Sequence, residues 1–80
     1  MKFYVYILVC VDKTLYVGWT TDLKKRLHAH NNLPTGAKYT HHRRPVTLGY
    51  SESFETKSEA MKREYALKQL NRQEKLALLQ

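Results

Sequence analysis

Two tyrosines and a glycine near the N-terminus are spaced so that they could form one chemical surface. Tyr6 and Tyr16 lie in two successive strand-like segments that a short loop can join as a hairpin. If the loop has three residues, 11–13, then Tyr6 lies opposite Gly18 and Tyr16 lies opposite Leu8. Both phenols then share one face with the glycine, where a bulky group could approach the backbone. A loop with an even number of residues would separate the tyrosines, and packing in an amphipathic sheet is the better interpretation for any single one.

A basic pair occupies the apolar side of the first expected helix. On a helical wheel Arg26 and His30 fall on the same side as Leu23 and Leu27. An arginine that extends its head group to solvent and a hydrogen-bonded core histidine would explain the pair without any chemistry. The alternative is that the guanidinium and the imidazole are held together because both belong to a functional site.

An acidic residue lies in the apolar stripe of a later helix. On the helical wheel Glu64 falls between Ala60 and Met61, on the same side as Leu67. A carboxylate in that position must be paired, bound to a metal, or neutralised by a raised pKa. A structural salt bridge, for example to Arg26, and a functional role are both open at this point.

The order of strand-like and helical segments predicts an α+β domain. Apolar or alternating stretches indicate strands at 3–10, 14–20 and 46–54. The first strand is apolar on both faces, which is typical of a central strand. Helical patterns occupy 23–30, a segment from 56 to about 70, and a segment from 71 to 79. We therefore expect a three-stranded, mainly antiparallel sheet with flanking helices, in the order β-β-α-β-α-α, with a long irregular stretch at 31–45.

Side chains that can cap helices support these boundaries. Thr20 or Thr21 can cap the first helix, with Asp22 in its first turn. Residues 56–59 match a capping box for the second helix, and Asn71 opens the third as a structural cap.

Size and charge limit the classes of function. The chain has 80 residues, with 14 Lys and Arg against 7 Asp and Glu, a formal charge of +7 and one cysteine. This length predicts one domain over 1–80, and the charge favours a polyanionic partner such as nucleic acid. The single cysteine excludes an internal disulfide framework and fits a reducing compartment, so we expect a cytoplasmic protein. The apolar run at 3–11 is half of a membrane span, so we expect no membrane partner, and no obligate protein partner is evident.

These residues also match the motif order of a known family. The chain reads Tyr4-Val5-Tyr6, Tyr16-Val17-Gly18, Arg26, His30-Asn31, Thr35-Gly36-Ala37-Lys38-Tyr39-Thr40, Arg44-Pro45 and Glu64. This order resembles the GIY-YIG nuclease superfamily over nearly the whole chain, and most of all its short, stand-alone bacterial branch. Tyr4 replaces the first glycine of the family name. The late asparagine of several family nucleases has no secure counterpart, so we interpret Asn71 as a cap.

The resemblance implies a divalent-metal-dependent endonuclease that hydrolyses DNA phosphodiester bonds, with structure-based or weak intrinsic selectivity. Glu64 would hold one cation, Mg²⁺ or Mn²⁺, because such hard ions prefer oxygen ligands. Arg26 would meet the phosphate oxygens with its planar pair of donors. Tyr16 would accept the proton of the attacking water, and nearby cations would have to favour its phenolate.

The other implied roles are supporting ones. Tyr6 would orient the water or the phosphate, and His30 would assist proton transfer or orient a partner. Gly18 would keep the tyrosine surface clear. Contacts to the DNA backbone are expected from six further residues, namely Lys24, Lys25, Lys38, Tyr39, Arg43 and Arg44.

Two other functions fit the same sequence. A non-catalytic nucleic-acid-binding module on the same fold would bind DNA in a salt-sensitive manner without cleaving it. An adaptor whose basic face meets an acidic protein would not be retained on DNA at physiological salt. An adaptor has no need of the polar set of tyrosines, arginine, histidine and glutamate, so it is the weakest of the three.

Overall fold

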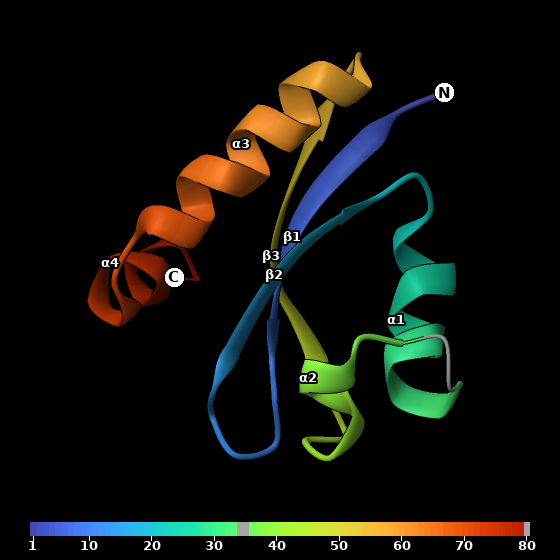
Figure 1. Ribbon diagram of the computed structural model, residues 1–80, viewed down its shortest axis with the longest axis vertical. Helices are drawn as coiled ribbons and strands as arrows, with labels where there is room; N and C mark the ends of the chain where they lie inside the picture. The colour runs from blue at the N-terminus through green and yellow to red at the C-terminus, as the bar shows by residue number, and fades with distance from the viewer. Residues whose placement is uncertain (34–35, 80) are drawn as a thin grey trace.

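A three-stranded antiparallel sheet lies between two pairs of helices (Figure 1). The structure, a computed structural model, describes residues 1–33 and 36–79, so Pro34, Thr35 of the sequence motif and Gln80 lie outside the described residues. The strands are β1 (Phe3–Val9), β2 (Leu15–Thr20) and β3 (Thr47–Phe54), in the spatial order β2-β1-β3. The helices are α1 (Leu23–Asn32), α2 (Lys38–His41), α3 (Lys57–Gln69) and α4 (Arg72–Leu78). The predicted α+β class and three-stranded sheet are confirmed.

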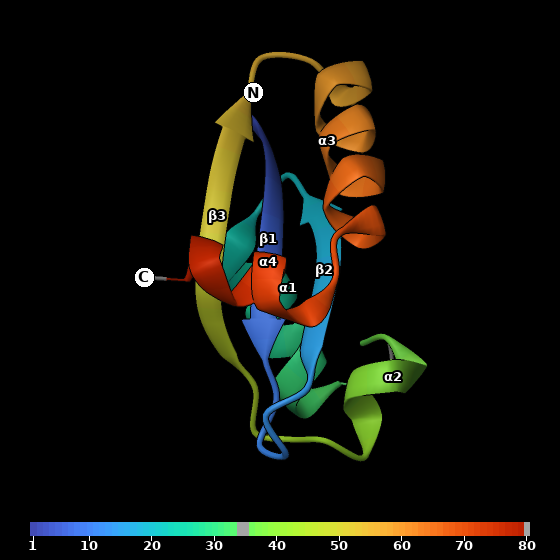
Figure 2. The ribbon, with the colours of Figure 1, turned by 90° about the vertical axis from the view of Figure 1, so that its left-hand side faces the viewer.

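Strand β1 is the central strand, as its two apolar faces predict. On one face Val5 and Ile7 are buried against Ala60 and Leu67 of α3. On the other face Tyr6 and Leu8 pack with apolar residues of α1, namely Leu23 and Leu27. Both cores therefore share one strand, and α1 and α3 lie on opposite sides of the sheet (Figures 1 and 2).

The β1–β2 hairpin has the register that a three-residue loop dictates. Tyr6 is opposite Gly18, and Tyr16 is opposite Leu8. Lys13 in the loop adopts a left-handed backbone conformation with φ of 71°, and its amide donates to the carbonyl of Cys10 at 2.9 Å. A residue in this conformation is typical of three-residue hairpin loops. The prediction that both tyrosines share a face with the glycine is confirmed.

The first helix is capped by a different residue from the one predicted. Asp22, not Thr20 or Thr21, is the N-cap of α1, and its carboxylate accepts from the backbone amide of Lys25 at 3.0 Å. The Thr20 hydroxyl instead accepts from the amide of Asp22 at 3.2 Å. The threonine therefore braces the cap, and the aspartate lies one position before the first turn in which it was expected.

The stretch between α1 and β3 is more ordered than the sequence predicted. It contains the short helix α2 and is attached to α1 by side chains. Asn31 makes a reciprocal pair of hydrogen bonds with the backbone of Val46, at 3.0 and 2.7 Å. Arg44 donates to the carbonyls of His30 and Leu33, both at 2.6 Å. These polar contacts hold a segment that has few apolar residues of its own.

Helices α3 and α4 begin at the predicted caps. Thr56 and Glu59 form a capping box at α3, and Asn71 and Glu74 form a second one at α4. The predicted structural role of Asn71 is thereby confirmed. Among the helices in the described part of the chain, none has the length and apolar character needed to cross a lipid bilayer.

The Asn71 cap gives a first prediction. Asn71→Ala removes the side-chain acceptor for the Glu74 amide, which lies at 2.9 Å. We expect the free energy of unfolding to fall by about 1 kcal/mol, measured by urea denaturation. Asn71→Asp retains a capping oxygen and should remain close to the parent protein. Equal losses in both variants would contradict the assignment.

Candidate active site

A buried tyrosine–histidine pair forms the centre of the candidate site. The Tyr6 hydroxyl and Nε2 of His30 are 3.0 Å apart, and the two residues are 2% and 0% exposed. Tyr16 packs edge-on against the imidazole, with ring centroids 5.2 Å apart. Residues from β1, β2 and α1 are thus brought into one cluster, as the hairpin register and the helical wheel predicted.

Gly18 makes room for this cluster. A Cβ atom built at this position would lie 2.5 Å from the Tyr6 hydroxyl oxygen and 3.3 Å from a ring carbon of Tyr16. Real Cβ atoms do not make contacts as short as the first one. The glycine is therefore required by the close approach of the Tyr6 phenol.

Arg26 and Glu64 act on Tyr6 with opposite charges. Burial is the main cause that raises the pKa of the Tyr6 phenol. A hydrogen bond and the positive charge from Arg26 lower that pKa, whereas the interactions with the Tyr16 phenol and the Glu64 carboxylate raise it. The guanidinium and the carboxylate therefore both belong to the electrostatic environment of this hydroxyl.

Glu64 approaches from the other side of the sheet. It lies on α3, which packs over β1 and the edge strand β2, whereas Arg26 and His30 lie on α1. Its side chain is 21% exposed and forms an ion pair at 3.6 Å with Lys68, one turn further along α3. Its charge is one of the causes that raise the pKa of Tyr6, the residue opposite Gly18 of the edge strand β2.

The donor set at this edge fits a hard divalent cation that keeps much of its water. Mg²⁺ is commonly bound by one or two carboxylates together with waters and substrate phosphates. Glu64 offers a partly exposed carboxylate whose contact with Lys68 is a long one. Within 1–33 and 36–79, no three His, Cys, Asp or Glu side chains form a cluster that could enclose a metal. A cation here would thus be held by one protein carboxylate and by the substrate.

His30 has a second partner that the sequence interpretation did not identify. Its Nδ1 lies 2.8 Å from the hydroxyl of Thr40, a fully buried residue of α2. Burial, followed by the positive charges of Arg26 and Arg44, lowers the pKa of His30 to about 4. The imidazole is therefore neutral at physiological pH. Thr40 belongs to the sequence motif at 35–40, but its hydrogen bond with His30 becomes evident only from the position of α2.

Tyr39 and Arg43 extend the cluster toward the surface. The Tyr39 ring stacks on Tyr16, with centroids 5.8 Å apart, and is 40% exposed. The Arg43 guanidinium lies 4.2 Å from the centroid of the Tyr39 ring and donates to Asp12 at 3.1 Å. An aromatic ring and a cation thus lie directly beside Tyr16.

The other predicted contacts to DNA are distributed differently. Lys24, Lys25 and Lys38 are exposed, and Lys25 and Arg26 line a hollow of about 310 Å³ at the start of α1. Arg44 donates to backbone carbonyls at the end of α1 instead, so the structure places its guanidinium within the fold.

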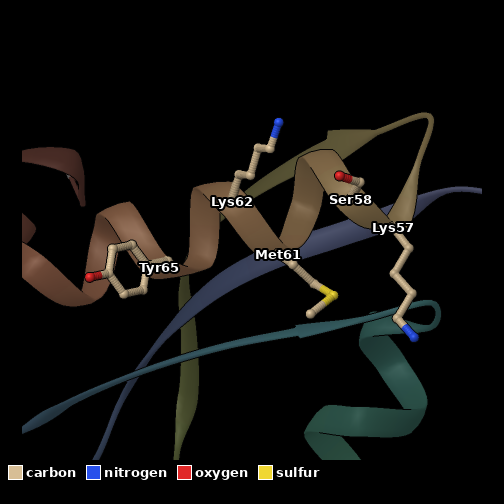
Figure 3. A pocket seen from close by; sticks show the side chains of 5 residues that line it. All are labelled: Lys57, Ser58, Met61, Lys62 and Tyr65. Atoms are coloured by element: carbon tan, nitrogen blue, oxygen red, sulfur yellow. The ribbon is translucent and has the colours of Figure 1, made fainter.

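A hollow on α3 was not anticipated from the sequence (Figure 3). It measures about 510 Å³, and the residues that line it lie on the same helix as Glu64. They are Lys57, Ser58, Met61, Lys62 and Tyr65. Tyr65 is 68% exposed and Met61 is 46% exposed, which is unusual for large side chains of these types. Lys57 reaches over the Trp19 ring of β2 at 5.5 Å, so this surface extends to the same sheet edge.

Comparisons with known proteins show which family this chain resembles. The family model of the GIY-YIG catalytic domain matches residues 2–77. A UPF0213 protein of Staphylococcus saprophyticus is 55% identical over 98% of this chain and 94% of its own length. A UPF0213 protein of Clostridium perfringens is 58% identical over 95% of this chain and 81% of its own length.

Two solved structures are similar over the same extent. The solution NMR structure of a UPF0213 protein from Bacillus halodurans has a TM-score of 0.62 at 44% identity, and covers 99% of this chain and 83% of that one. A protein from E. faecalis, also solved by solution NMR, has a TM-score of 0.65 at 46% identity, and covers 98% of this chain and 83% of that one.

The contact at Gly18 gives a second prediction. Gly18→Ala forces its methyl group against the Tyr6 hydroxyl, so we expect a loss of about 1–3 kcal/mol in the free energy of unfolding. Removing that hydroxyl by Tyr6→Phe should make the glycine substitution less costly, because the 2.5 Å contact disappears and the 2.8 Å contact with the ring carbon remains. A double-mutant cycle by chemical denaturation measures this coupling. Strictly additive effects would show that the contact does not constrain the fold.

The lowered pKa of His30 gives a third prediction. The folded protein binds this proton more weakly than the unfolded chain, whose histidine has a pKa near the ordinary 6.5. The contribution of neutral His30 to the free energy of unfolding is therefore fully present above pH 6.5. It is lost as the pH falls through 4, by about 3 kcal/mol in total. An NMR titration of the His30 imidazole should give a midpoint near 4. A midpoint near 6.5 would refute the burial argument.

Proposed function

The chain belongs to the GIY-YIG catalytic domain family, and from this premise we propose that it is a divalent-metal-dependent endonuclease that cleaves DNA phosphodiester bonds. The observation that supports the proposal is the cluster in which Tyr6 and Tyr16 pack on His30 beside Gly18, with Arg26 and Glu64 among the groups that shift the pKa of Tyr6. A guanidinium and a carboxylate that share one phenol match the needs of phosphoryl chemistry, in which a polyanion is bound and a water is activated.

The side chains divide into three tasks in this proposal. Arg26 binds the scissile phosphate through its planar donors. Tyr16, on the edge strand, accepts the proton of the attacking water, and Tyr6 orients that water. His30 holds Tyr6 in place through the 3.0 Å hydrogen bond. Tyr16 is less buried than Tyr6 and lies on the edge strand. Its phenol is therefore the more accessible of the two, which supports its assignment as the proton acceptor.

Glu64 is the proposed ligand of Mg²⁺ or Mn²⁺. When bound, the cation supplies charge neutralisation at the phosphate and at the leaving oxygen.

DNA is proposed to bind along the edge of β2, mainly through its phosphates. Exposed Lys24, Lys25 and Lys38 lie on one side of this edge, and the lysines of the α3 hollow lie on the other. Contacts of this kind are independent of base sequence and weaken with salt.

The buried free thiol of Cys10 suits a reducing compartment, in accordance with the proposed cytoplasmic location.

The fourth prediction tests the activity. Glu64→Gln should lower the rate of Mg²⁺- or Mn²⁺-dependent cleavage on the order of a hundredfold or more, because it removes the anionic ligand with little change in shape. The measurement is a gel assay with duplex, single-stranded, flap and junction DNA. Glu55→Gln is the matched control, since Glu55 is an exposed carboxylate paired with Lys2 at the opposite end of β3 from α2.

Two results would change this assignment. Equal rates for Glu64→Gln and the parent protein would rule out the carboxylate as the metal ligand. Salt-sensitive DNA binding without cleavage of any substrate in the panel would select the non-catalytic binding module instead.

A further inference from the structure

The Thr40 hydroxyl makes two hydrogen bonds whose directions can be deduced. It donates to the backbone carbonyl of Ala37 at 3.0 Å, and it lies 2.8 Å from Nδ1 of His30. A hydroxyl has a single proton to donate. Since that proton goes to the carbonyl, the hydroxyl oxygen must accept from Nδ1, and Nδ1 must carry a proton.

The direction at Thr40 determines the direction at the other side of the imidazole. A neutral imidazole has one N–H group and one acceptor nitrogen. With the proton on Nδ1, Nε2 of His30 is the acceptor, and the Tyr6 hydroxyl at 3.0 Å is the donor. The depressed pKa of His30 supports the neutral form.

We propose that Thr40 is a positioning residue that sets the His30 tautomer and thereby directs the Tyr6 proton into the protein. The chain of donors runs from Tyr6 to His30, from His30 to Thr40, and from Thr40 to the carbonyl of Ala37. All three side chains are buried: His30 and Thr40 are 0% exposed, and Tyr6 is 2% exposed. The opposite tautomer would move the Thr40 proton from the Ala37 carbonyl, which also accepts from the Thr40 backbone amide at 3.1 Å, to Nδ1 of His30.

The consequence for the site lies at the Tyr6 oxygen. With its proton directed to His30, the hydroxyl offers only lone pairs to Arg26 and to the substrate side, so it accepts hydrogen bonds there and cannot donate them. An acceptor at this position orients an attacking water with a lone pair toward phosphorus. This step rests on the proposed nuclease function, whereas the tautomer itself does not.

The structure around α2 is consistent with this role. The helix has four residues, and Thr40 is its buried member. Arg44 and Asn31 attach the following segment to the end of α1, which carries His30. The segment thus holds one hydroxyl against one imidazole nitrogen.

The fifth prediction concerns the tautomer in the unmodified protein. Histidine ¹⁵N chemical shifts distinguish a protonated nitrogen from an acceptor nitrogen, and we expect Nδ1 of His30 to be protonated and Nε2 to be the acceptor at pH 7. The opposite tautomer, or rapid exchange between the two, would overturn the proposal. This measurement needs no substitution and no enzymatic activity.

Variants at Thr40 test the link to catalysis. Thr40→Val retains the shape but removes the hydroxyl, and Thr40→Ser retains the hydroxyl. We expect Thr40→Val to lose the fixed His30 tautomer and to lower kcat roughly tenfold or more with little change in KM, while Thr40→Ser stays close to the parent in both readouts. A Thr40→Val protein with the parental ¹⁵N shifts and rate would contradict the role of Thr40.

The two proposals can fail separately. If no DNA substrate is cleaved, the nuclease assignment fails, while the ¹⁵N shifts still report whether Thr40 sets the tautomer. If cleavage is found and the tautomer is the wrong one, only the positioning role is lost. Should Thr40→Val not fold, the parent protein and Thr40→Ser still decide the question through the shifts and kcat.

Discussion

The buried hydrogen bond between Tyr6 and His30 is the interaction on which the rest of the site depends. It fixes the central strand against α1, and it demands a glycine at position 18, because the phenol occupies the space of a side chain there. A polar pair without solvent must be fully satisfied, since an unpaired buried group is costly. The contact with Thr40 completes that requirement, and among described residues no buried side-chain polar atom lacks a partner.

The position of the site at an edge strand follows from the small size of the sheet. With three strands, both faces of β1 are needed for apolar packing, so the two cores occupy opposite sides. Charged groups from α1 and α3 would approach each other past an edge strand, and β2 is the edge strand that carries Tyr16 and contacts α3. A phosphate could approach there without crossing either core, and the excess of basic residues would attract it.

Much of this arrangement could be predicted from local patterns. Loop parity determines the register that places Tyr6, Tyr16 and Gly18 together, and the helical wheel places Arg26 and His30 on the inner side of α1. The contacts from residues 36–46 could not be predicted, because they are hydrogen bonds between groups distant in sequence and have no periodicity. Arg44 illustrates this limit, since a basic residue in a polar stretch suggests a phosphate contact but here binds carbonyls.

The central claim is that Glu64 and the tyrosine cluster form one site around a cation. The most direct measurement is paramagnetic broadening of backbone amide signals on titration with Mn²⁺. The account predicts broadening centred on Glu64 that extends across the β2 edge to Tyr16 and Gly18, and its loss when the carboxylate is replaced by an amide. Broadening centred elsewhere, or unchanged by that replacement, would contradict the claim.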